Sequence, residues 1–433
     1  MTASQIHKFT TSSKLRASMA GAPSLITFPV RRRERELVIP ARPTPYEFKM
    51  LSDIDDQDIL RFYRSGIFFY RGNASKTGLI DPVKVIRAAL SEALVYYYPL
   101  AGRFRELQPT RKLVVECTGE GVVFVEADAD VRMDELGPSL APPVTCYDRL
   151  LCEPERPTAD VVDRPLLYIQ VTRMSCGGFI FGHREYAPLP DPDKDAAVSA
   201  TDDAFAHHAF FFGPGEIATL RSRAPPDLRA TTSRFDHVGA FMWRCRTAAL
   251  QFDAGDLVRL HVFVNARSRS RRPVVPRGYY GNAVALAAAS APAGEICKKP
   301  FGQYALRLLL EAKARASEEG YLQSVAAFNA AHRRPPFPKA RTHLISDVTN
   351  AGVMALDFGW GNPVYGGPAT TMLATFHLEG RNEAGEAGIL VPMRLPAPAM
   401  ERLKLMVAKE LAAADDVDGG KKNLVADPVL AKL

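Results

Sequence analysis

The sequence predicts an α/β protein with two domains. A length of 433 residues is enough for two hydrophobic cores of ordinary size. Helical and strand patterns alternate through both halves of the chain, which is typical of α/β proteins. A polar, proline-marked stretch at 188–205 separates the halves. We therefore expect a disordered leader extension at 1–21, domains at 22–187 and 206–415, a linker at 188–205, and a tail at 416–433.

The first half is predicted to contain one helix and a series of strands. Asp81 and Pro82 mark the start of the helix, because aspartate caps a helix and proline fits its first turn. Apolar residues then recur at helical spacing, and Pro99 ends the pattern. The preceding chain is predicted to be extended at 42–49 and then to turn into an irregular segment at 51–55. Strands are expected at 103–106, 113–117, 122–126, 166–172 and 178–181, the last two as a hairpin.

The second half shows the same alternation. Pro214 is predicted to open a short helix after a strand at 210–212. Helices with one apolar face are predicted at 236–250, 301–318 and 399–413. Strands are expected at 257–264, 342–346, 372–377 and 388–393.

Composition excludes several classes of protein. The chain has 47% apolar and 24% charged residues, and no apolar run approaches the roughly 18 residues of a membrane-spanning helix. The net charge of +7 is dispersed among acids, as in 31–36, which favours a solvated surface over a nucleic-acid interface. A modest positive field would also suit a substrate that carries phosphates. The six cysteines have no C-x-x-C and no His–Cys metal spacing, so we expect a reducing compartment and no metal.

The first residues leave two interpretations of localisation. Residues 1–18 contain no acids and carry Ser, Thr, Lys and Arg, which is typical of transit peptides. Met19 is also a possible alternative start, and this favours a leader extension. We expect a cytoplasmic protein.

The most distinctive stretch is Asp357-Phe358-Gly359-Trp360-Gly361. Two glycines around a tryptophan predict a tight turn pinned by a buried indole, because glycine tolerates positive φ and the indole is a large apolar anchor. A kinase interpretation of the DFG fails, because the chain has no HRD loop, no G-x-G-x-x-G loop and no VAIK-like strand.

This string also resembles the C-terminal signature of the plant BAHD acyltransferases, which move an acyl group from a coenzyme A thioester to an alcohol or amine. Further resemblances follow in family order over roughly residues 22–410: YYYPLAGR at 96–103, ECTGEGVVFVEADAD at 116–130, PLLYIQVT at 165–172, CGGFIFG at 176–182, FFFGP at 210–214 and YYGNA at 279–283. Together they resemble most closely the branch that acylates alcohols with acetyl or benzoyl groups.

The resemblance implies an architecture and a set of partners. It implies two chloramphenicol-acetyltransferase-like domains, with mixed sheets flanked by helices and a channel at the domain interface. It also implies a monomer that uses acyl-CoA as co-substrate and a small-molecule acceptor, with no permanently bound cofactor and no nucleic-acid or membrane partner.

One family motif is missing. In relatives, the strand equivalent to CGGFIFG runs into H-x-x-x-D-G, whose histidine is the general base. Here Gly182 is followed by His183-Arg184-Glu185-Tyr186, and no aspartate stands four residues after His183. This implies an internal deletion, from exon skipping or an error in gene prediction. We expect impaired acyl transfer, with a catalytically dead acyl-CoA-binding protein or an unstable product as the alternatives.

Two histidines are candidates for the base. His183 emerges at the end of the strand that normally delivers it, although it could equally be a linker histidine. His343 and Asp347 also match H-x-x-x-D, but His343 lies in a predicted strand and the chance of one random match is about even, so we interpret it as a decoy.

The resemblance also implies roles for residues outside the base. Tyr280, Gly281 and Asn282 stand where relatives line the coenzyme A side of the channel, although their polar atoms could equally satisfy a turn. Arg267 is expected to form a structural ion pair with Asp357, because a guanidinium suits a bidentate carboxylate contact. Two unrelated surface charges are the alternative.

Overall fold

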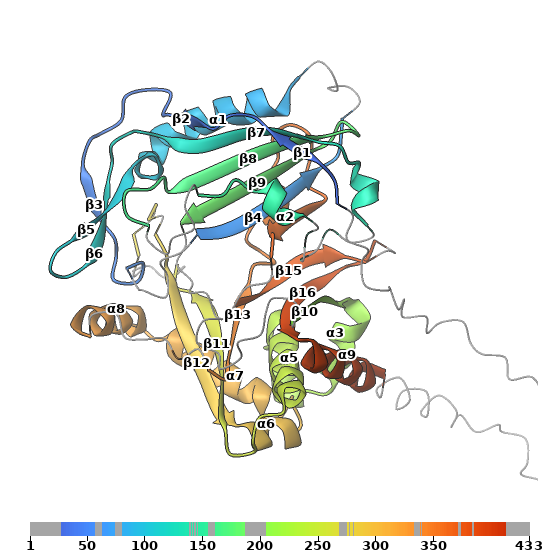
Figure 1. The fold of residues 1–433 in the computed structure, drawn as a ribbon. Helices are drawn as coiled ribbons and strands as arrows, with labels where there is room; N and C mark the ends of the chain where they lie inside the picture. Colours follow the sequence, from blue (N-terminus) through green and yellow to red (C-terminus); the bar gives the residue numbers. More distant parts are fainter. Residues whose placement is uncertain are drawn as a thin grey trace, which may run out of the picture.

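The structure is a computed structural model, and two large sheets dominate it, one above the other in Figure 1. It describes residues 27–56, 63–73, 80–137, 140, 142, 144, 146–154, 161–186, 205–267, 275–276, 278–279, 281–332, 338, 340–370, 374–382 and 385–412. The predicted leader and tail, and nearly all of the predicted linker, lie outside these ranges.

The first sheet is built mainly from the first half of the chain. Its seven strands are ordered β1-β7-β8-β9-β4-β14, and β2 also pairs with β7. Strands β8 and β9 form the predicted antiparallel hairpin, whereas β7 and β8 are parallel. A smaller sheet has the order β3-β6-β5. The bounds are β1 Val30–Arg32, β2 Glu36–Val38, β3 Phe48–Met50, β4 Tyr63–Tyr70, β5 Arg103–Leu107, β6 Lys112–Glu116, β7 Val122–Ala129, β8 Leu167–Met174 and β9 Phe179–Tyr186.

Helix α1 (Pro82–Tyr96) lies along one face of the first sheet (Figure 1). It begins as predicted, because the Asp81 side chain accepts a hydrogen bond of 3.2 Å from the backbone N–H of Val83. Its buried residues pack in one cluster with side chains of β4 and β9, including Tyr70 and Phe181. The opposite face is covered by α2 (Tyr147–Leu150) and neighbouring loops. Short 3₁₀ turns lie at Tyr98–Ala101, Met133–Leu136 and Val353–Ala355.

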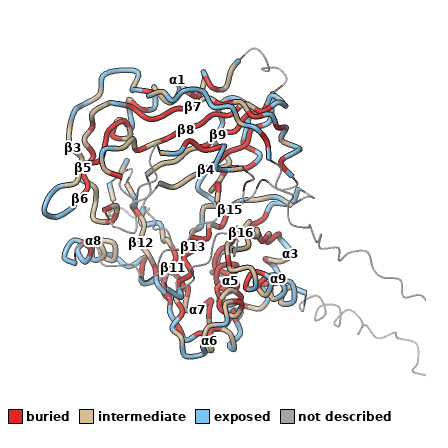
Figure 2. Tube along the Cα trace, in the orientation of Figure 1, coloured by how far each residue is buried: buried red, intermediate tan, exposed pale blue. Residues whose placement is uncertain are grey.

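The second sheet has six strands in the order β10-β16-β15-β13-β11-β12. Strand β13 is parallel to both β11 and β15, and the other pairs are antiparallel. Helix α5 (Arg234–Leu250) is mostly buried, as the red parts of its tube in Figure 2 show, and its Trp243 is among the largest fully buried side chains. The remaining bounds are β10 Phe205–Phe212, α3 Pro214–Ser222, α4 Pro226–Arg229, β11 Leu257–Asn265, β12 Val284–Pro292, α6 Ala293–Lys298, α7 Ala305–Ala316, α8 Tyr321–Ala331, β13 Thr342–Asp347, β14 Tyr365–Pro368, β15 Ala374–Arg381, β16 Ala387–Pro396 and α9 Ala397–Ala412.

A strand of the second half joins the two halves by pairing with the first sheet. Strand β14 comes from the second half but pairs antiparallel with β4, at the edge of the first sheet. Its Tyr365 packs in one cluster with Ile67 and Phe69 of β4 and with Leu378 of β15. The boundary between the two bodies therefore passes through the second half of the chain as well as between 187 and 206.

Several short elements were not predicted, and neither were the longer elements β4, β12 and α8. The three longer elements are discussed below with the physical reasons. The expected helices at 236–250, 301–318 and 399–413 are present as α5, α7 and α9, with ends shifted by a few residues.

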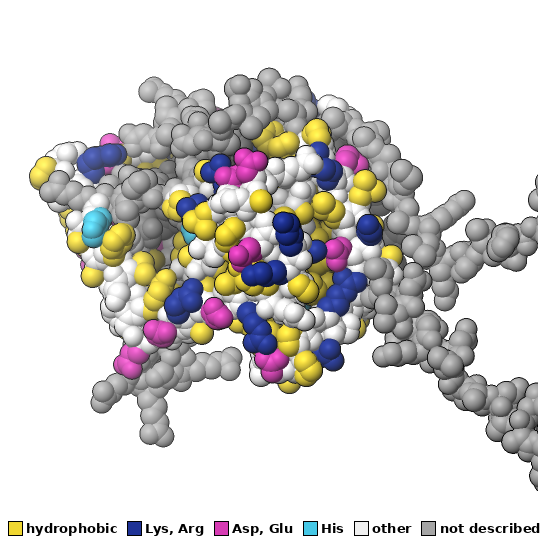
Figure 3. Space-filling model, turned by 90° about the horizontal axis from the view of Figure 1, so that it is seen from below, with side chains coloured by type: hydrophobic (Ala, Val, Ile, Leu, Met, Phe, Trp, Pro, Cys, Tyr) yellow, Lys and Arg dark blue, Asp and Glu magenta, His cyan; other side chains and the backbone are white. Residues whose placement is uncertain are grey.

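The surface and composition add three findings. Among the described residues, no helix has the length and apolar character needed to cross a membrane. All six cysteines are free thiols, and no group of described side chains could hold a metal ion. Seen from below, basic side chains are interspersed with acidic and apolar ones (Figure 3).

Candidate active site

His183 is an interior residue of β9, not the end of a strand. It stands opposite Gly66 of β4 and Ile169 of β8 in the sheet. Its imidazole lies over Gly66: a Cβ at that position would be 2.2 Å from His183 Nε2. The ring is flanked by Phe68 and Phe181, each with a centroid distance of 5.9 Å. The missing side chain of Gly66 therefore gives the imidazole its place on the sheet.

The surroundings of His183 favour the neutral form of its ring. Burial lowers the pKa of His183, and the positive charge of Arg64 adds to this, while Glu185 opposes it. Arg64 and Glu185 stand opposite each other on β4 and β9 and form an ion pair of 2.5 Å. A neutral imidazole can accept a proton. However, no hydrogen bond to another described residue orients this ring, and an oriented base is what acyl transfer requires.

The loop at 357–361 is a tight turn, as its residues predict. The Asp357 carboxylate accepts hydrogen bonds from the backbone N–H groups of Gly359 at 2.6 Å and Gly361 at 2.8 Å. Both glycines have positive φ, +96° and +89°. Trp360 is half-buried, so the indole is less enclosed than predicted.

This loop fastens the second half of the chain to the first sheet. The ring of Phe358 lies 5.1 Å from Phe181, and the ring of Trp360 lies 5.3 Å from Phe179. The hydroxyl of Tyr70 donates a hydrogen bond of 2.9 Å to the carbonyl of Leu356. Since Phe181 contacts both Phe358 and His183, the structure brings His183 and the loop to the same face of β9.

Gly281 and Asn282 form a second contact between the halves. The backbone N–H and the side-chain amide of Asn282 donate to the Asp55 carboxylate at 3.0 and 2.7 Å. The Tyr279 hydroxyl donates to the same carboxylate at 3.3 Å. A Cβ at Gly281 would lie 2.7 Å from an oxygen of the Asp55 carboxylate. These polar atoms therefore hold a contact between the halves, and the coenzyme A role that the resemblance implies for Gly281 and Asn282 stays a prediction. Tyr280 lies outside the described residues.

The predicted ion pair between Arg267 and Asp357 is wrong. The Arg267 guanidinium donates instead to the carbonyl oxygens of Tyr279 and Gly281, the latter at 2.8 Å. The Asp357 carboxylate is occupied by its own turn. Both side chains are exposed, so neither gains from leaving water to meet the other.

His343 has no access to a substrate. It is 2% exposed, it lies in β13, and its Nε2 is 3.2 Å from the Thr375 hydroxyl. Burial lowers the pKa of His343 well below its usual value, and the nearby Arg246 adds to this. Asp347 is exposed at the end of the strand and binds Thr349. The match at 343–347 is therefore structural.

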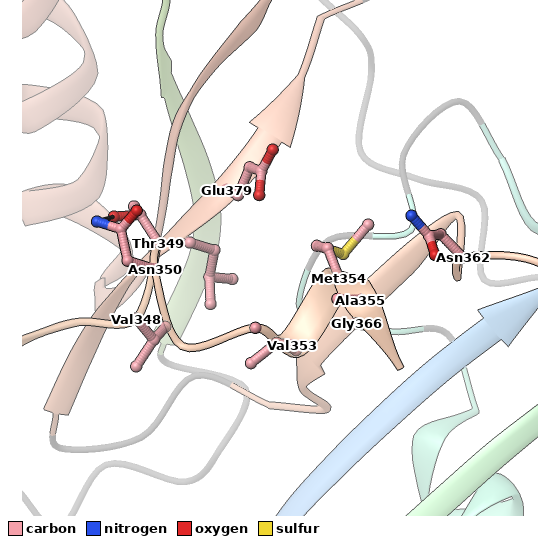
Figure 4. A pocket seen from close by; sticks show the side chains of 11 residues that line it. Val348, Thr349, Asn350, Val353, Met354, Ala355, Asn362, Gly366 and Glu379 are labelled. Atoms are coloured by element: carbon pink, nitrogen blue, oxygen red, sulfur yellow. Dashed lines mark hydrogen bonds between the residues drawn. The ribbon is translucent and has the colours of Figure 1, made fainter. Parts of the chain in front are cut away.

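A cavity of about 350 Å³ lies beside the loop, between the segment that follows β13, strand β14 and strand β15. Figure 4 shows Thr349, Asn350 and Glu379 towards one end of it and Met354 and Asn362 towards the other. Its size suits a small organic molecule, and its lining contains no lysine or arginine. None of the predicted site residues lines it.

Comparison with known proteins decides the family. The model of the Transferase family matches residues 28–184 and 183–407, which is most of the chain. This chain belongs to the Transferase family, the BAHD acyltransferases. It is 43% identical to the benzyl alcohol O-benzoyltransferase of Petunia hybrida, over 88% of this chain and 93% of that enzyme. It is 40% identical to the (Z)-3-hexen-1-ol acetyltransferase of Arabidopsis thaliana, over 87% and 94%.

Solved BAHD-like structures share the fold. The crystal structure of vinorine synthase matches with a TM-score of 0.67 at 21% identity, over 88% of this chain and 98% of that one. TRI101 of F. sporotrichioides, solved with coenzyme A and T-2, matches with a TM-score of 0.62 at 16% identity, over 83% and 97%. The predicted α/β class, with mixed sheets flanked by helices, is confirmed.

Sequence reasoning missed three residues that surround the candidate site residues. Gly66 and Arg64 lie in β4, for which no strand was predicted, and Asp55 lies in a turn to which no role was given. A signal for Gly66 was present, since it directly precedes the apolar run at 67–70. No pattern pointed to Asp55.

Proposed function

We propose that this chain derives from acyl-CoA-dependent transferases that place an acetyl or benzoyl group on a plant alcohol, and that it transfers the group slowly because its general base is missing. It works as a cytoplasmic monomer, with acyl-CoA and a small alcohol as its partners. The observation that carries this proposal is the break in the family match. Residues 28–184 and 183–407 match as two separate segments that meet at His183.

The alignment lengths support a deletion in this chain. The alignment with the petunia enzyme has 437 positions, but 88% of the 433 residues here is about 381 residues. About 56 positions therefore stand opposite gaps in this chain. A segment of that length is enough for the H-x-x-x-D motif at the end of a strand, a helix and a connection.

The packing at the junction supports the impairment. His183 lies within a paired strand, held by Phe68 and Phe181, and no described residue orients it by a hydrogen bond. Loss of a general base typically lowers the rate about 10²- to 10⁴-fold. Binding and orientation of the two substrates still accelerate the reaction, so we expect a residual rate.

Turnover and binding measured on the same protein test the proposal. We expect coenzyme A release from benzoyl-CoA with benzyl alcohol to be detectable but slow, and saturable binding of benzoyl-CoA by calorimetry. His183→Ala is expected to change the residual rate less than twofold, as is the matched control His332→Ala, an exposed histidine at the end of α8.

Three other results would each point elsewhere. A rate typical of the family that His183→Ala abolishes would make His183 the base and refute the impairment. Binding without any turnover would support the catalytically dead alternative. Aggregation with exposed apolar surface would support the unstable product.

A further inference from the structure

A surface cavity of about 520 Å³ lies at the edge of the second sheet, where α3, α4, the first turn of α5 and the start of β16 meet. Three of the eight residues around it are arginines, and none is acidic. The lining is Pro214, Ile217, Ala218, Arg221, Ser222, Arg229, Arg234 and Ala387. We call it the arginine cavity.

Two of the three guanidinium groups of this cavity are held by neutral partners. Arg229 donates from Nε to the carbonyl of Ala224 at 2.8 Å and from Nη2 to that of Ser222 at 2.7 Å. Arg221 donates to the carbonyl of Thr232 at 3.4 Å. These contacts position two of the guanidiniums without cancelling their charge, and their remaining N–H donors stay available.

The acidic residues nearby in the sequence bind partners other than the arginines of the cavity. Asp227 forms an ion pair with Arg307, and Asp236 forms one with Lys313. Glu216 caps its own helix by accepting from the backbone N–H of Gly213 at 2.9 Å. Within the described ranges, no carboxylate forms an ion pair with an arginine of the cavity.

The positive charge of the cavity affects the pKa of a buried neighbour, His237. His237 is fully buried on α5. Burial lowers the pKa of His237, and the charge of Arg221 lowers it further, against Asp236. Three cations around one hollow repel each other, and a bound anion would relieve that repulsion.

The number and type of the cations favour a phosphate. The planar guanidinium fork matches phosphate and carboxylate oxygens in pairs. Three such groups exceed the single charge of a carboxylate but match a phosphomonoester or a pyrophosphate, which carry two or more charges. Ile217, Ala218 and Pro214 add an apolar wall for an organic body.

We propose that the arginine cavity binds the phosphate group of a small organic molecule. Gly281 and Asn282 do not line it, so it is separate from the positions that the resemblance assigns to the coenzyme A side of the channel. The phosphate belongs either to coenzyme A, reached from outside the channel, or to an independent phosphorylated metabolite.

Calorimetry on the full chain with pyrophosphate as the probe tests this site. We expect saturable binding that Arg229→Gln and Arg234→Gln each weaken by roughly tenfold or more, since each removes a charged hydrogen-bond donor. The control is Arg315→Gln, which removes an exposed arginine of α7 that also donates to a backbone carbonyl, that of Ala288. We expect it to weaken binding less than twofold.

Two results would overturn the proposal: no saturable binding of pyrophosphate, or equal weakening by Arg315→Gln and Arg229→Gln. Adding excess coenzyme A then identifies the source. Displacement of the pyrophosphate assigns the cavity to coenzyme A phosphates, and no displacement assigns it to another phosphorylated molecule. Because the readout is binding, its outcome does not depend on acyl transfer.

Discussion

Replacing Gly66 with alanine tests how His183 is held on the sheet. The new Cβ would lie 2.2 Å from His183 Nε2 and 2.9 Å from Cδ2 and Cε1, so the ring must move. These atoms are the tip of a flexible side chain, and the backbone pairing of β4 with β9 is retained. We therefore expect the imidazole to swing off Gly66 while the protein stays folded.

The cost follows from the contacts that the ring would lose. His183 touches Phe68 and Phe181 at centroid distances of 5.9 Å each. An aromatic pair contributes about 0.5–1.5 kcal/mol, so the free energy of unfolding is expected to fall by about 1–3 kcal/mol. For domains of this size that lowers the melting temperature by roughly 2–4 °C per kcal/mol.

Urea denaturation and the NMR shift of the His183 ring measure the two effects. Gly215→Ala is the matched control, because nothing lies within 4 Å of its new Cβ, and we expect it to be neutral or slightly stabilising. Unchanged stability together with an unchanged ring resonance would show that Gly66 does not seat His183. A loss above about 5 kcal/mol would show that the backbone, not the ring, gives way.

Three further predictions concern the loop, the buried histidines and the contact between the halves. Asp357→Ala removes the acceptor of two backbone hydrogen bonds and should cost about 1–3 kcal/mol of unfolding free energy. A double-mutant cycle with Arg267→Ala should give a coupling below about 0.5 kcal/mol, whereas more than about 1 kcal/mol would restore the ion pair. Burial lowers the pKa of His377 to about 3, below the roughly 6.5 of a histidine in an unfolded chain. As the pH falls, the unfolded state therefore takes up the proton first, and the free energy of unfolding falls below about pH 6.5. Between about pH 7 and pH 5 this should remove about 2 kcal/mol of unfolding free energy. Since burial also lowers the pKa of His261 and His343, His377→Gln should remove only its own share of the loss in urea titrations at the two pH values, and an equal loss in the variant and the unchanged protein would contradict this prediction. Asp55→Ala and Asn282→Ala should each weaken the contact between the halves and lower the free energy of unfolding by about 1–2 kcal/mol. The double variant should lose no more than either single variant, and additive losses would show that the two side chains act separately.

Elements with local signals could be predicted from the sequence. Helix α1 was predictable because Asp81 and Pro82 carry its start, and the turn at 357–361 because two glycines and an aspartate close it within five residues. The order of family strings gave the fold class, because that order reflects the topology of relatives.

Elements that depend on distant partners could not be predicted. Strand β4 forms only by pairing with β9 and β14, which lie more than a hundred residues away, and its Gly66 weakens the strand pattern. Strand β12 is alanine-rich, which does not favour a strand, yet alternate alanines from 285 to 291 are buried next to α7. Helix α8 is mostly exposed and shows a weak apolar face.

In the candidate site, too, features with a local signal could be predicted, whereas features that depend on distant partners could not. The chain order predicted that His183 follows a strand, whereas its place within β9 and over Gly66 depends on the pairing with β4. The expected pair of Arg267 and Asp357 failed because each group found closer partners in its own loop. Which of several polar partners a surface charge takes depends on loop geometry, which sequence spacing does not encode.

The general base is tested most directly by restoring what the chain lacks. The segment of the petunia benzoyltransferase that aligns opposite the break would be inserted between Gly182 and His183, and kcat/KM measured with benzoyl-CoA and benzyl alcohol. We predict a rise of about 10²- to 10⁴-fold, absent when the histidine of the inserted H-x-x-x-D motif is replaced by alanine. No rise with a folded insertion variant, or a family-level rate without any insertion, would contradict this account.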